Sequence, residues 1–324
     1  MITINLHSGQ GLGNQLWIIA TGYCLSLKKN TTFEILSPNF FKGNSIFDLD
    51  KYFNRITNYK KINKNIFHES MYYHRNQNCF VFSFDKSIKD TSPDTAIEGN
   101  FQSLEYFFGY IEELKKLLNP NQDIIKKSSQ FSEYGVLNIR GGEYKRSKNL
   151  LLPKSYWVNS YNRLLEFHDK KNIICVTDDF KYTKYLFPDM EIISGKIEEC
   201  FAALLGSRNA SVSNSSFAFF PLFLNKNIKN IYAPYQWSRF NNKENLWFNP
   251  CNFYEKWKWL NSDNYIVTIK DCLKNIDYTN NYFKENFQKS FFYLPQEPNK
   301  KKKIYLYLKY LIKKILGLFF IRYS

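Results

Sequence analysis

The residues best suited to hold a phosphate-bearing ligand stand directly after predicted strands. Near the N-terminus, a glycine-rich stretch at residues 8–15 (Ser-Gly-Gln-Gly-Leu-Gly-Asn-Gln) separates an alternating apolar run at 2–6 from a helical stripe. Glycine lets backbone approach a ligand closely, and N–H groups at a helix start favour anions. Asn14 stands where the G-x-G-x-x-G fingerprint needs its third glycine, and no P-loop Gly-Lys-Ser/Thr follows. The stretch alone indicates either an anion-binding loop or a tight strand-to-helix turn.

Two further segments have the same position relative to strands. Arg140 ends an apolar run and precedes two glycines. Its guanidinium is always charged and matches the geometry of a phosphate, although a surface arginine in a turn has the same sequence pattern. Asn214, Ser215 and Ser216 stand between a predicted strand and a predicted helix. Short polar side chains there either cap the helix or frame an anion site at its N–H groups.

Carboxylates and histidines give weaker signals. Asp178 and its neighbour Asp179 follow a predicted strand, where they could contact a ribose or base or merely cap the next helix. Asp48 and Asp50 form a D-x-D pattern, but in an irregular region without a strand before it, so no metal site is expected there. The four histidines show neither triad nor metal spacing, and His7 alone adjoins a predicted site.

Strands and helices alternate regularly through the second half of the chain. Strands are predicted at 136–140, 173–177, 191–193, 210–213 and 228–233, the last of the series. Helices are predicted at 153–168, 179–187, 197–205 and 215–224. In the less regular first half, strands are predicted at 2–6, 33–36 and 96–99, and helices from 12 and over 103–118. This alternation predicts an α/β fold with parallel sheet covered on both faces.

The net charge of +16 is concentrated at the C-terminal end. Residues 300–324 carry eight lysines and arginines and no acid, which leaves 16 − 8 = 8 positive charges for the rest of the chain. A nucleic-acid partner is therefore not expected. Apolar residues recur in this tail at helical spacing, which predicts an amphipathic helix on an anionic membrane surface; a disordered basic end is the alternative.

The cysteines and the N-terminal residues indicate in which cellular compartment the protein is expected. The six cysteines form no C-x-x-C and no zinc pattern. Residue 1 leads directly into a strand, so no signal peptide is expected. We expect a chain in the reducing cytoplasm, bound peripherally to the inner face of the cytoplasmic membrane.

Taken in order, the segments resemble the family 11 glycosyltransferases, the alpha-1,2-fucosyltransferases. The similar blocks span residues 1–240: Gly11-Leu12-Gly13-Asn14-Gln15-Leu16, Gly99-Asn100-Phe101-Gln102-Ser103-Leu104-Glu105-Tyr106-Phe107, Asn138-Ile139-Arg140-Gly141-Gly142-Glu143, Thr177-Asp178-Asp179, Asn214-Ser215-Ser216-Phe217, and Ala233-Pro234 with Trp237. Asn138 and Glu143 replace a histidine and an aspartate of the family pattern, which leaves the exact sugar open.

The resemblance implies a GT-B-like fold, with two Rossmann-like domains and a cleft between them. Residues 1–125 would form the acceptor-side domain with the glycine loop, and 126–298 the nucleotide-sugar domain. Residues 299–324 would form the basic membrane-surface tail. A likeness of this kind also implies inversion at the anomeric carbon by direct displacement, with neither metal nor cofactor.

The resemblance further implies transfer of L-fucose from GDP-fucose to a hydroxyl, the 2-OH of galactose, of a lipid-linked bacterial surface glycan such as O-antigen or lipooligosaccharide. Arg140 would neutralise the diphosphate, and Glu143 and His7 are the candidate general bases. The other expected binding residues are Gly11, Gly13, Asn14, Gln15, Asp178, Asn214, Ser215, Ser216 and Phe217. The alternatives are the same scaffold with another nucleotide deoxysugar, such as a dideoxyhexose, or a non-enzymatic basic membrane-binding module.

Overall fold

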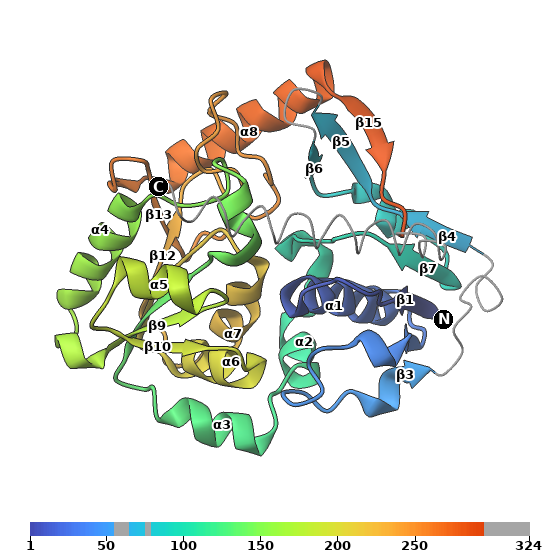
Figure 1. The fold of residues 1–324 in the computed structure, drawn as a ribbon. Coiled ribbons are helices and arrows are strands. Elements are labelled where there is room, and N and C mark those ends of the chain that lie inside the picture. Colours follow the sequence, from blue (N-terminus) through green and yellow to red (C-terminus); the bar gives the residue numbers. More distant parts are fainter. Residues whose placement is uncertain (55–64, 75–78, 295–324) are drawn as a thin grey trace, which may run out of the picture. The chain divides into compact units, whose positions relative to one another are not determined.

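The computed structural model describes residues 1–54, 65–74 and 79–294, which fold with two largely parallel sheets and helices around them (Figure 1). The expected α/β fold class is confirmed, and residues 1–292 form one compact unit. The predicted tail helix at 300–324 lies outside the described residues. The predicted division between residues 125 and 126 stays a prediction, and helix α3 (Gln122–Ser129) runs across that position.

The first sheet has the order β3-β2-β1-β7-β4, and all of its strands are parallel. Its strands are β1 (Ile2–Asn5), β2 (Phe33–Leu36), β3 (Phe53–Asn54), β4 (Asn65–His68) and β7 (Thr95–Glu98). The chain builds outward from β1 on one side, then returns to place β7 on the other side. Helix α1 (Leu12–Lys28) follows β1 and packs against it and β2.

The second sheet repeats this plan with the order β10-β9-β8-β11-β12-β13-β14. Its strands are β8 (Gly135–Ile139), β9 (Ile173–Thr177), β10 (Glu191–Ser194), β11 (Asn209–Val212), β12 (Asn230–Pro234), β13 (Lys258–Leu260) and β14 (Ile266–Val267). Its helices are α4 (Lys154–Leu165), α5 (Phe180–Leu186), α6 (Ile197–Gly206) and α7 (Phe219–Leu224). Only β14 is antiparallel to its neighbour.

Both faces of the second sheet are buried under helices. Successive side chains along a strand point to opposite faces, so neighbouring residues of one strand pack in different clusters. Val136 belongs to the cluster that contains residues of α6, whereas Leu137 belongs to the cluster that contains residues of α4 and α5. In each sheet the chain switches direction beside a central strand, between β1 and β7 in the first and between β8 and β11 in the second. Open α/β sheets bind ligands at the carboxyl ends of strands at such switch points.

The third sheet joins distant parts of the chain. It has the antiparallel order β15-β5-β6, with β5 (Ser70–His74), β6 (Cys79–Phe82) and β15 (Gln288–Phe291). The remaining α-helices of the described residues are α2 (Ile111–Leu117) and α8 (Ile269–Asn286). Figure 1 shows α8 leading directly into β15 beside β5.

Two sequence expectations about elements were wrong, and one helix was not predicted at all. The helix expected over 103–118 is interrupted, because Phe108 and Gly109 both have positive φ (51° and 88°), which ends a helical turn before α2 begins. The strand at 228–233 is not the last, since β13 and β14 follow it. Helix α8 was missed: its amphipathic pattern lies in a Lys- and Asn-rich segment where polar residues dominate.

One apolar core extends from the first sheet to the helices of the second. Trp17 of α1 is fully buried and stacks on Phe219 of α7, with ring centroids 4.3 Å apart, and on Phe107 at 5.5 Å. Stacked aromatic pairs add about 0.5–1.5 kcal/mol to the burial itself. This core fixes the start of α1 against the segment that follows β11.

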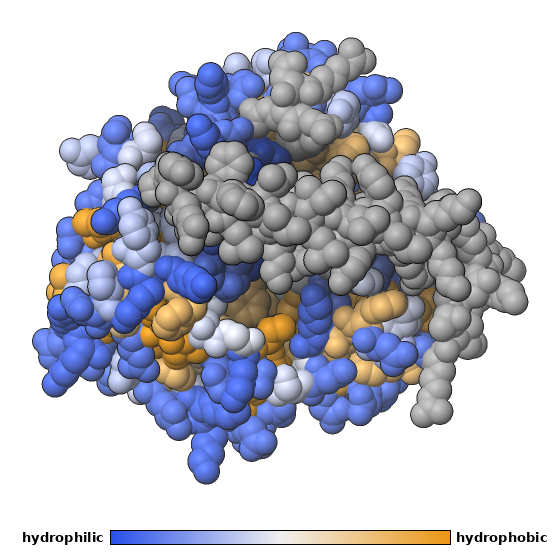
Figure 2. All heavy atoms as spheres, in the orientation of Figure 1, coloured by the Kyte–Doolittle hydropathy of each residue, from blue (hydrophilic) through white to orange (hydrophobic). Residues whose placement is uncertain are grey.

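Hydrophilic residues cover most of the coloured surface in Figure 2, with hydrophobic residues exposed in small groups among them. Such scattered exposure is ordinary for a folded chain. Within the described ranges, no helix is both long enough and apolar enough to cross a membrane.

Candidate functional site

A pocket of about 720 Å³ opens at the carboxyl ends of the strands of both parallel sheets. From the first sheet it is lined by the glycine loop after β1 and by Gln102 after β7. From the second it is lined by the segments after β8, β9, β10, β11 and β12. A pocket at two topological switch points is where a doubly wound sheet is expected to hold a ligand.

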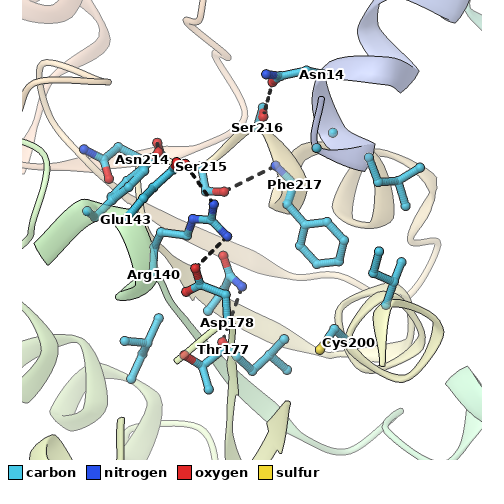
Figure 3. A pocket seen from close by; sticks show the side chains of 18 of the residues that line it. Asn14, Arg140, Glu143, Thr177, Asp178, Cys200, Asn214, Ser215, Ser216 and Phe217 are labelled. Atoms are coloured by element: carbon cyan, nitrogen blue, oxygen red, sulfur yellow. Dashed lines mark hydrogen bonds and ion pairs between the residues drawn. The ribbon is translucent and has the colours of Figure 1, made fainter. Parts of the chain in front are cut away.

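Arg140 follows β8 and points into this pocket between two carboxylates (Figure 3). Its Nη1 lies 2.8 Å from Asp178 Oδ2, and its Nη2 lies 3.2 Å from Glu143 Oε1. The guanidinium carbon stands 5.4 Å from the centroid of the Tyr144 ring. These contacts hold the planar cation in one orientation while its side chain remains 30% exposed toward the pocket.

Asp178 also orders the backbone beside Arg140. Its Oδ1 accepts the N–H of Gly141 at 2.9 Å. Gly142 has a positive φ of 24°, and a Cβ there would lie 2.2 Å from Asp178 Oδ2. A side chain at this position would therefore displace the carboxylate that orients Arg140, so glycine is required.

Asp179 caps α5, as expected, by accepting the N–H of Tyr182 at 3.1 Å. Burial raises the pKa of its carboxyl, but hydrogen bonds from Lys145 and from the Tyr182 N–H outweigh it and hold the pKa below its usual value. Asp179 is thus a charged structural cap, and Asp178 is the member of this pair that lines the pocket.

The segment after β11 is fixed by its amide and by a tyrosine. The Asn214 side-chain amide donates to the carbonyls of Ser238 at 2.8 Å and Leu150 at 3.2 Å, and the backbone carbonyl of Asn214 accepts the Tyr144 hydroxyl at 2.9 Å. Burial raises the pKa of Tyr144 to about 12. Ser215 caps the following turn by accepting the N–H of Phe217.

The glycine loop meets this segment directly. A Cβ on Gly13 would lie 2.5 Å from the backbone of Ser216 and from the nitrogen of Phe217. Asn14, the residue that breaks the dinucleotide fingerprint, accepts the Ser216 hydroxyl at 2.5 Å through its Oδ1 (Figure 3). Its oxygen also accepts Gln102 Nε2 at 3.0 Å. Two motifs from opposite ends of the matched region thus form one wall of the pocket.

Most of the predicted site residues line the pocket, and two of them lie outside its lining. Gly11, Asp178, Asn214, Ser215, Ser216 and Phe217 line the pocket together with Gly13, Asn14, Arg140 and Glu143. Gln15 is buried outside it, where it donates to Phe40 O at 2.6 Å and accepts Lys42 N at 3.0 Å. His7 also lies outside the lining, with Nδ1 2.9 Å from Ser8 O.

Sequence reasoning missed several lining residues. Lys42 has no motif around it, and it reaches the pocket because Gln15 holds its backbone. Gln102, Asn138 and Trp237 were noted only as members of matched blocks. Tyr144 stands one residue after the matched block that contains Arg140, and its contact with Asn214 has no signal in the sequence.

A metal site was not expected. Among the residues that the structure describes, no group of three or more His, Cys, Asp or Glu side chains could hold a metal ion. The lining cations are Lys42, Arg140 and Lys196, and the lining carboxylates are Glu143 and Asp178. The pocket therefore has fixed positive charge for an anionic ligand.

No family model matches the chain, and no curated protein matches it. Among solved structures, it is similar to fucosyltransferase NodZ from Bradyrhizobium (10% identity, 71% of this chain and 94% of that one, TM-score 0.42). It is also similar to POFUT1 in complex with GDP (12%, 69% and 93%, TM-score 0.41) and to a variant of FUT1 from Arabidopsis thaliana in complex with GDP (9%, 72% and 70%, TM-score 0.43). These likenesses are distant.

Proposed function

We propose that this chain is an inverting glycosyltransferase that moves L-fucose from GDP-fucose to an acceptor hydroxyl. One observation carries the proposal. Blocks that resemble alpha-1,2-fucosyltransferases, and that stand far apart in the chain, contribute Gly13, Asn14, Arg140, Asp178 and Ser216 to a single pocket. Residues with unrelated structural duties would not be expected to converge in this way.

Arg140 is the proposed partner of the diphosphate. Asp178 and Glu143 hold its guanidinium before the donor arrives, so little reorganisation accompanies binding. Fixed charge near the leaving group stabilises the negative charge that grows there as the glycosidic bond breaks. Ser215 lies in the same lining, and its hydroxyl, which accepts the Phe217 N–H, still has its own hydrogen to donate to a ligand.

Two unpaired polar atoms of the site also suit a ligand. Arg140 Nε and Asn214 Oδ1 are buried, and neither has a hydrogen-bond partner among the described residues. A buried polar atom left unpaired costs about 1–3 kcal/mol. A ligand with both acceptors and donors, as a nucleoside diphosphate sugar has, could recover part of that cost.

The proposed reaction is a single displacement. The acceptor oxygen attacks the anomeric carbon, the bond from that carbon to the phosphate oxygen breaks, and GDP leaves with the electron pair. Glu143 is the proposed base for the acceptor proton, since it lines the pocket and its side chain is 70% exposed. His7 lies outside the lining and is the weaker candidate. We propose that neither metal nor cofactor takes part.

The acceptor and location are also proposals. The 2-OH of galactose in a lipid-linked bacterial surface glycan, such as O-antigen or lipooligosaccharide, follows from the family likeness alone. Residues 300–324, which lie outside the described residues, would hold the enzyme at the inner face of the cytoplasmic membrane.

A donor panel tests the proposal. The purified chain is incubated with GDP-fucose, GDP-mannose, UDP-galactose and a nucleotide-linked dideoxyhexose, with galactose-terminated acceptors, and the product linkage is determined by NMR. Transfer from GDP-fucose with an alpha-1,2 linkage is expected. Preferential use of the dideoxyhexose would show that this sugar, and not fucose, is the one transferred. Transfer from none of the donors would contradict the proposal.

A further inference from the structure

One fully buried carboxylate, Glu69, does not line the pocket. Glu69 connects β4 to β5 and is fully buried. Its Oε2 accepts the backbone N–H groups of Asn100 at 2.7 Å and Phe101 at 2.9 Å. Its Oε1 accepts the Tyr106 hydroxyl at 2.8 Å. Within the described residues it forms no ion pair with a lysine, arginine or histidine, and its three hydrogen-bond partners are all donors.

The loop that Glu69 binds has an unusual backbone. Phe101 is fully buried and has a positive φ of 49°, a conformation that non-glycine residues rarely adopt. A Cβ on Gly99 would lie 2.6 Å from Glu69 Cβ, so loop and glutamate are in direct contact. A backbone of this kind persists where surrounding contacts over-determine it, and the two N–H bonds to Glu69 supply such contacts.

The same loop ends in a residue of the pocket wall. Gln102 lines the pocket, donates to Asn14 Oδ1 at 3.0 Å and accepts Asn252 Nδ2 at 3.0 Å. Asn14 in turn accepts Ser216 Oγ. No residue separates Phe101, whose N–H is held by Glu69, from this network, since Gln102 follows Phe101 directly.

We propose that Glu69 is a positioning residue, whose carboxylate fixes the loop after β7 so that Gln102 and Asn14 form the pocket wall on the side of the first sheet. The inference rests on the proposed function, because that wall belongs to the proposed site. It goes beyond that function by assigning the wall's geometry to a buried group that does not line the pocket.

The hydrogen-bond pattern suits only the charged form of Glu69. All three neighbouring groups donate, whereas a protonated carboxyl would need an acceptor for its own hydrogen. Burial nevertheless raises the pKa of Glu69 to about 7, against the hydrogen bonds that lower it. The titratable groups around it are Tyr106, Asp85 after β6 and Cys251 from the loop before β13. Protonation as the pH falls through about 7 would leave one hydrogen of this cluster without an acceptor and so change the geometry of the hydrogen bonds to the loop.

The principal test is Glu69→Gln, with Glu98→Gln as its matched control. Glu98 is another buried carboxylate of the first sheet, but it faces His68 at 3.1 Å. Steady-state transfer is measured against acceptor concentration from pH 6 to pH 8.5, and GDP affinity is measured by calorimetry. Glu69→Gln should lower kcat/KM for the acceptor on the order of 10- to 100-fold at pH 8, with GDP affinity within about twofold of the parent.

The pH profile separates positioning from simple support of the fold. The parent and Glu98→Gln should lose activity as the pH falls through about 7, which gives their pH profiles an acid limb. The pH profile of Glu69→Gln should have no such limb. Tyr106→Phe removes one hydrogen-bond donor to the charged Glu69, so it should raise the pKa of Glu69 and move the acid limb to higher pH. This variant is the alternative test if Glu69→Gln does not fold. A Glu69→Gln enzyme with the kinetics and pH profile of the parent overturns the proposal, as does an unmoved limb in Tyr106→Phe.

Hydrogen exchange of the ligand-free chain distinguishes this inference from the proposed function. The Asn100, Phe101 and Gln102 amides should exchange on the order of tenfold or more faster in Glu69→Gln than in Glu98→Gln. If the parent transfers no sugar and binds no GDP, the proposed function fails while faster exchange still supports the positioning role. Unchanged exchange overturns the positioning role, whatever the activity.

Discussion

Asn14 Oδ1 accepts the hydroxyl of Ser216 at 2.5 Å, although 202 residues separate the two positions in the chain. The contact links the loop after β1 to the segment after β11, and so links the two parallel sheets across the pocket. Its geometry depends on the adjacent glycine, which lets the backbones approach more closely than any Cβ would allow.

We expect Gly13→Ala to lower the free energy of unfolding by about 1–3 kcal/mol, as overpacking does. Alanine is the better helix former, but here its Cβ would lie 2.5 Å from backbone atoms that cannot rotate away. Urea denaturation measures the change. Gly11→Ala is the control for stability, because its Cβ would meet nothing within 4 Å. Equal stability of the two variants would contradict the close contact.

Arg140→Lys should reduce turnover by about 10²–10³, because lysine keeps the charge but loses the planar fork. The protein should remain folded, since the side chain is partly exposed and Asp178 keeps its bond to Gly141. Initial rates and circular dichroism check both statements. Arg208→Lys, in a surface pair with Glu133, should leave turnover unchanged. Turnover near that of the parent in Arg140→Lys would remove this residue from the site.

Transfer should continue undiminished in excess EDTA. The expectation follows from the family likeness and from the sequence, whose carboxylates and histidines predict no metal site. Rates are compared before and after chelation and after addition of Mn²⁺ or Mg²⁺. Activity that disappears with EDTA and returns with either ion would contradict it and would direct attention to Asp48 and Asp50.

Stability should respond to pH in the direction opposite to activity. The pKa of Glu69 is raised from 4.5 to about 7, so its favourable contribution is complete below about pH 4.5 and is lost as the pH rises through 7. A shift of this size corresponds to about 3 kcal/mol. The free energy of unfolding, measured at pH 5 and pH 8, should fall less in Glu69→Gln than in the parent. A difference of the same size in both chains would refute the assignment.

Deletion of residues 300–324 should release the protein from membranes. Each lysine near an anionic surface contributes about 1 kcal/mol, and eight cationic residues stand in this segment. Co-sedimentation with vesicles rich in phosphatidylglycerol measures the binding. Transfer to a short soluble acceptor should be retained, because the matched blocks end before residue 240. Equal sedimentation of the full and shortened chains would exclude the segment as an anchor.

The second half of the fold was predictable because its apolar runs have the length and spacing of buried strands and amphipathic helices. The five strands from β8 to β12 begin and end within two residues of the expected positions, whereas β13 and β14 were not expected. Helix α8 and the break at Gly109 were not predictable in this way. A polar-rich helix is stabilised by what it packs against, and a positive φ at Phe108 depends on its surroundings rather than on residue type.

In the site, the residues with an intrinsic chemical signature were found from sequence: arginine beside glycines, and short polar caps after strands. Lys42 and Tyr144 line the pocket only because other segments hold them there, and no local pattern indicates it. Glu69 gave no signal for the same reason, since burial and its three donors arise only in the folded chain.

Strand β15 has a consequence for biosynthesis. It pairs with β5, and the neighbouring contact of His68 Nδ1 with Phe292 O spans 224 residues. A ribosome adds roughly 5–20 residues per second, so the hairpin of β5 and β6 waits on the order of 10–40 seconds for its third strand. During translation the hairpin presents an unpaired edge, the kind of surface that chaperones cover and that mispairs between nascent chains.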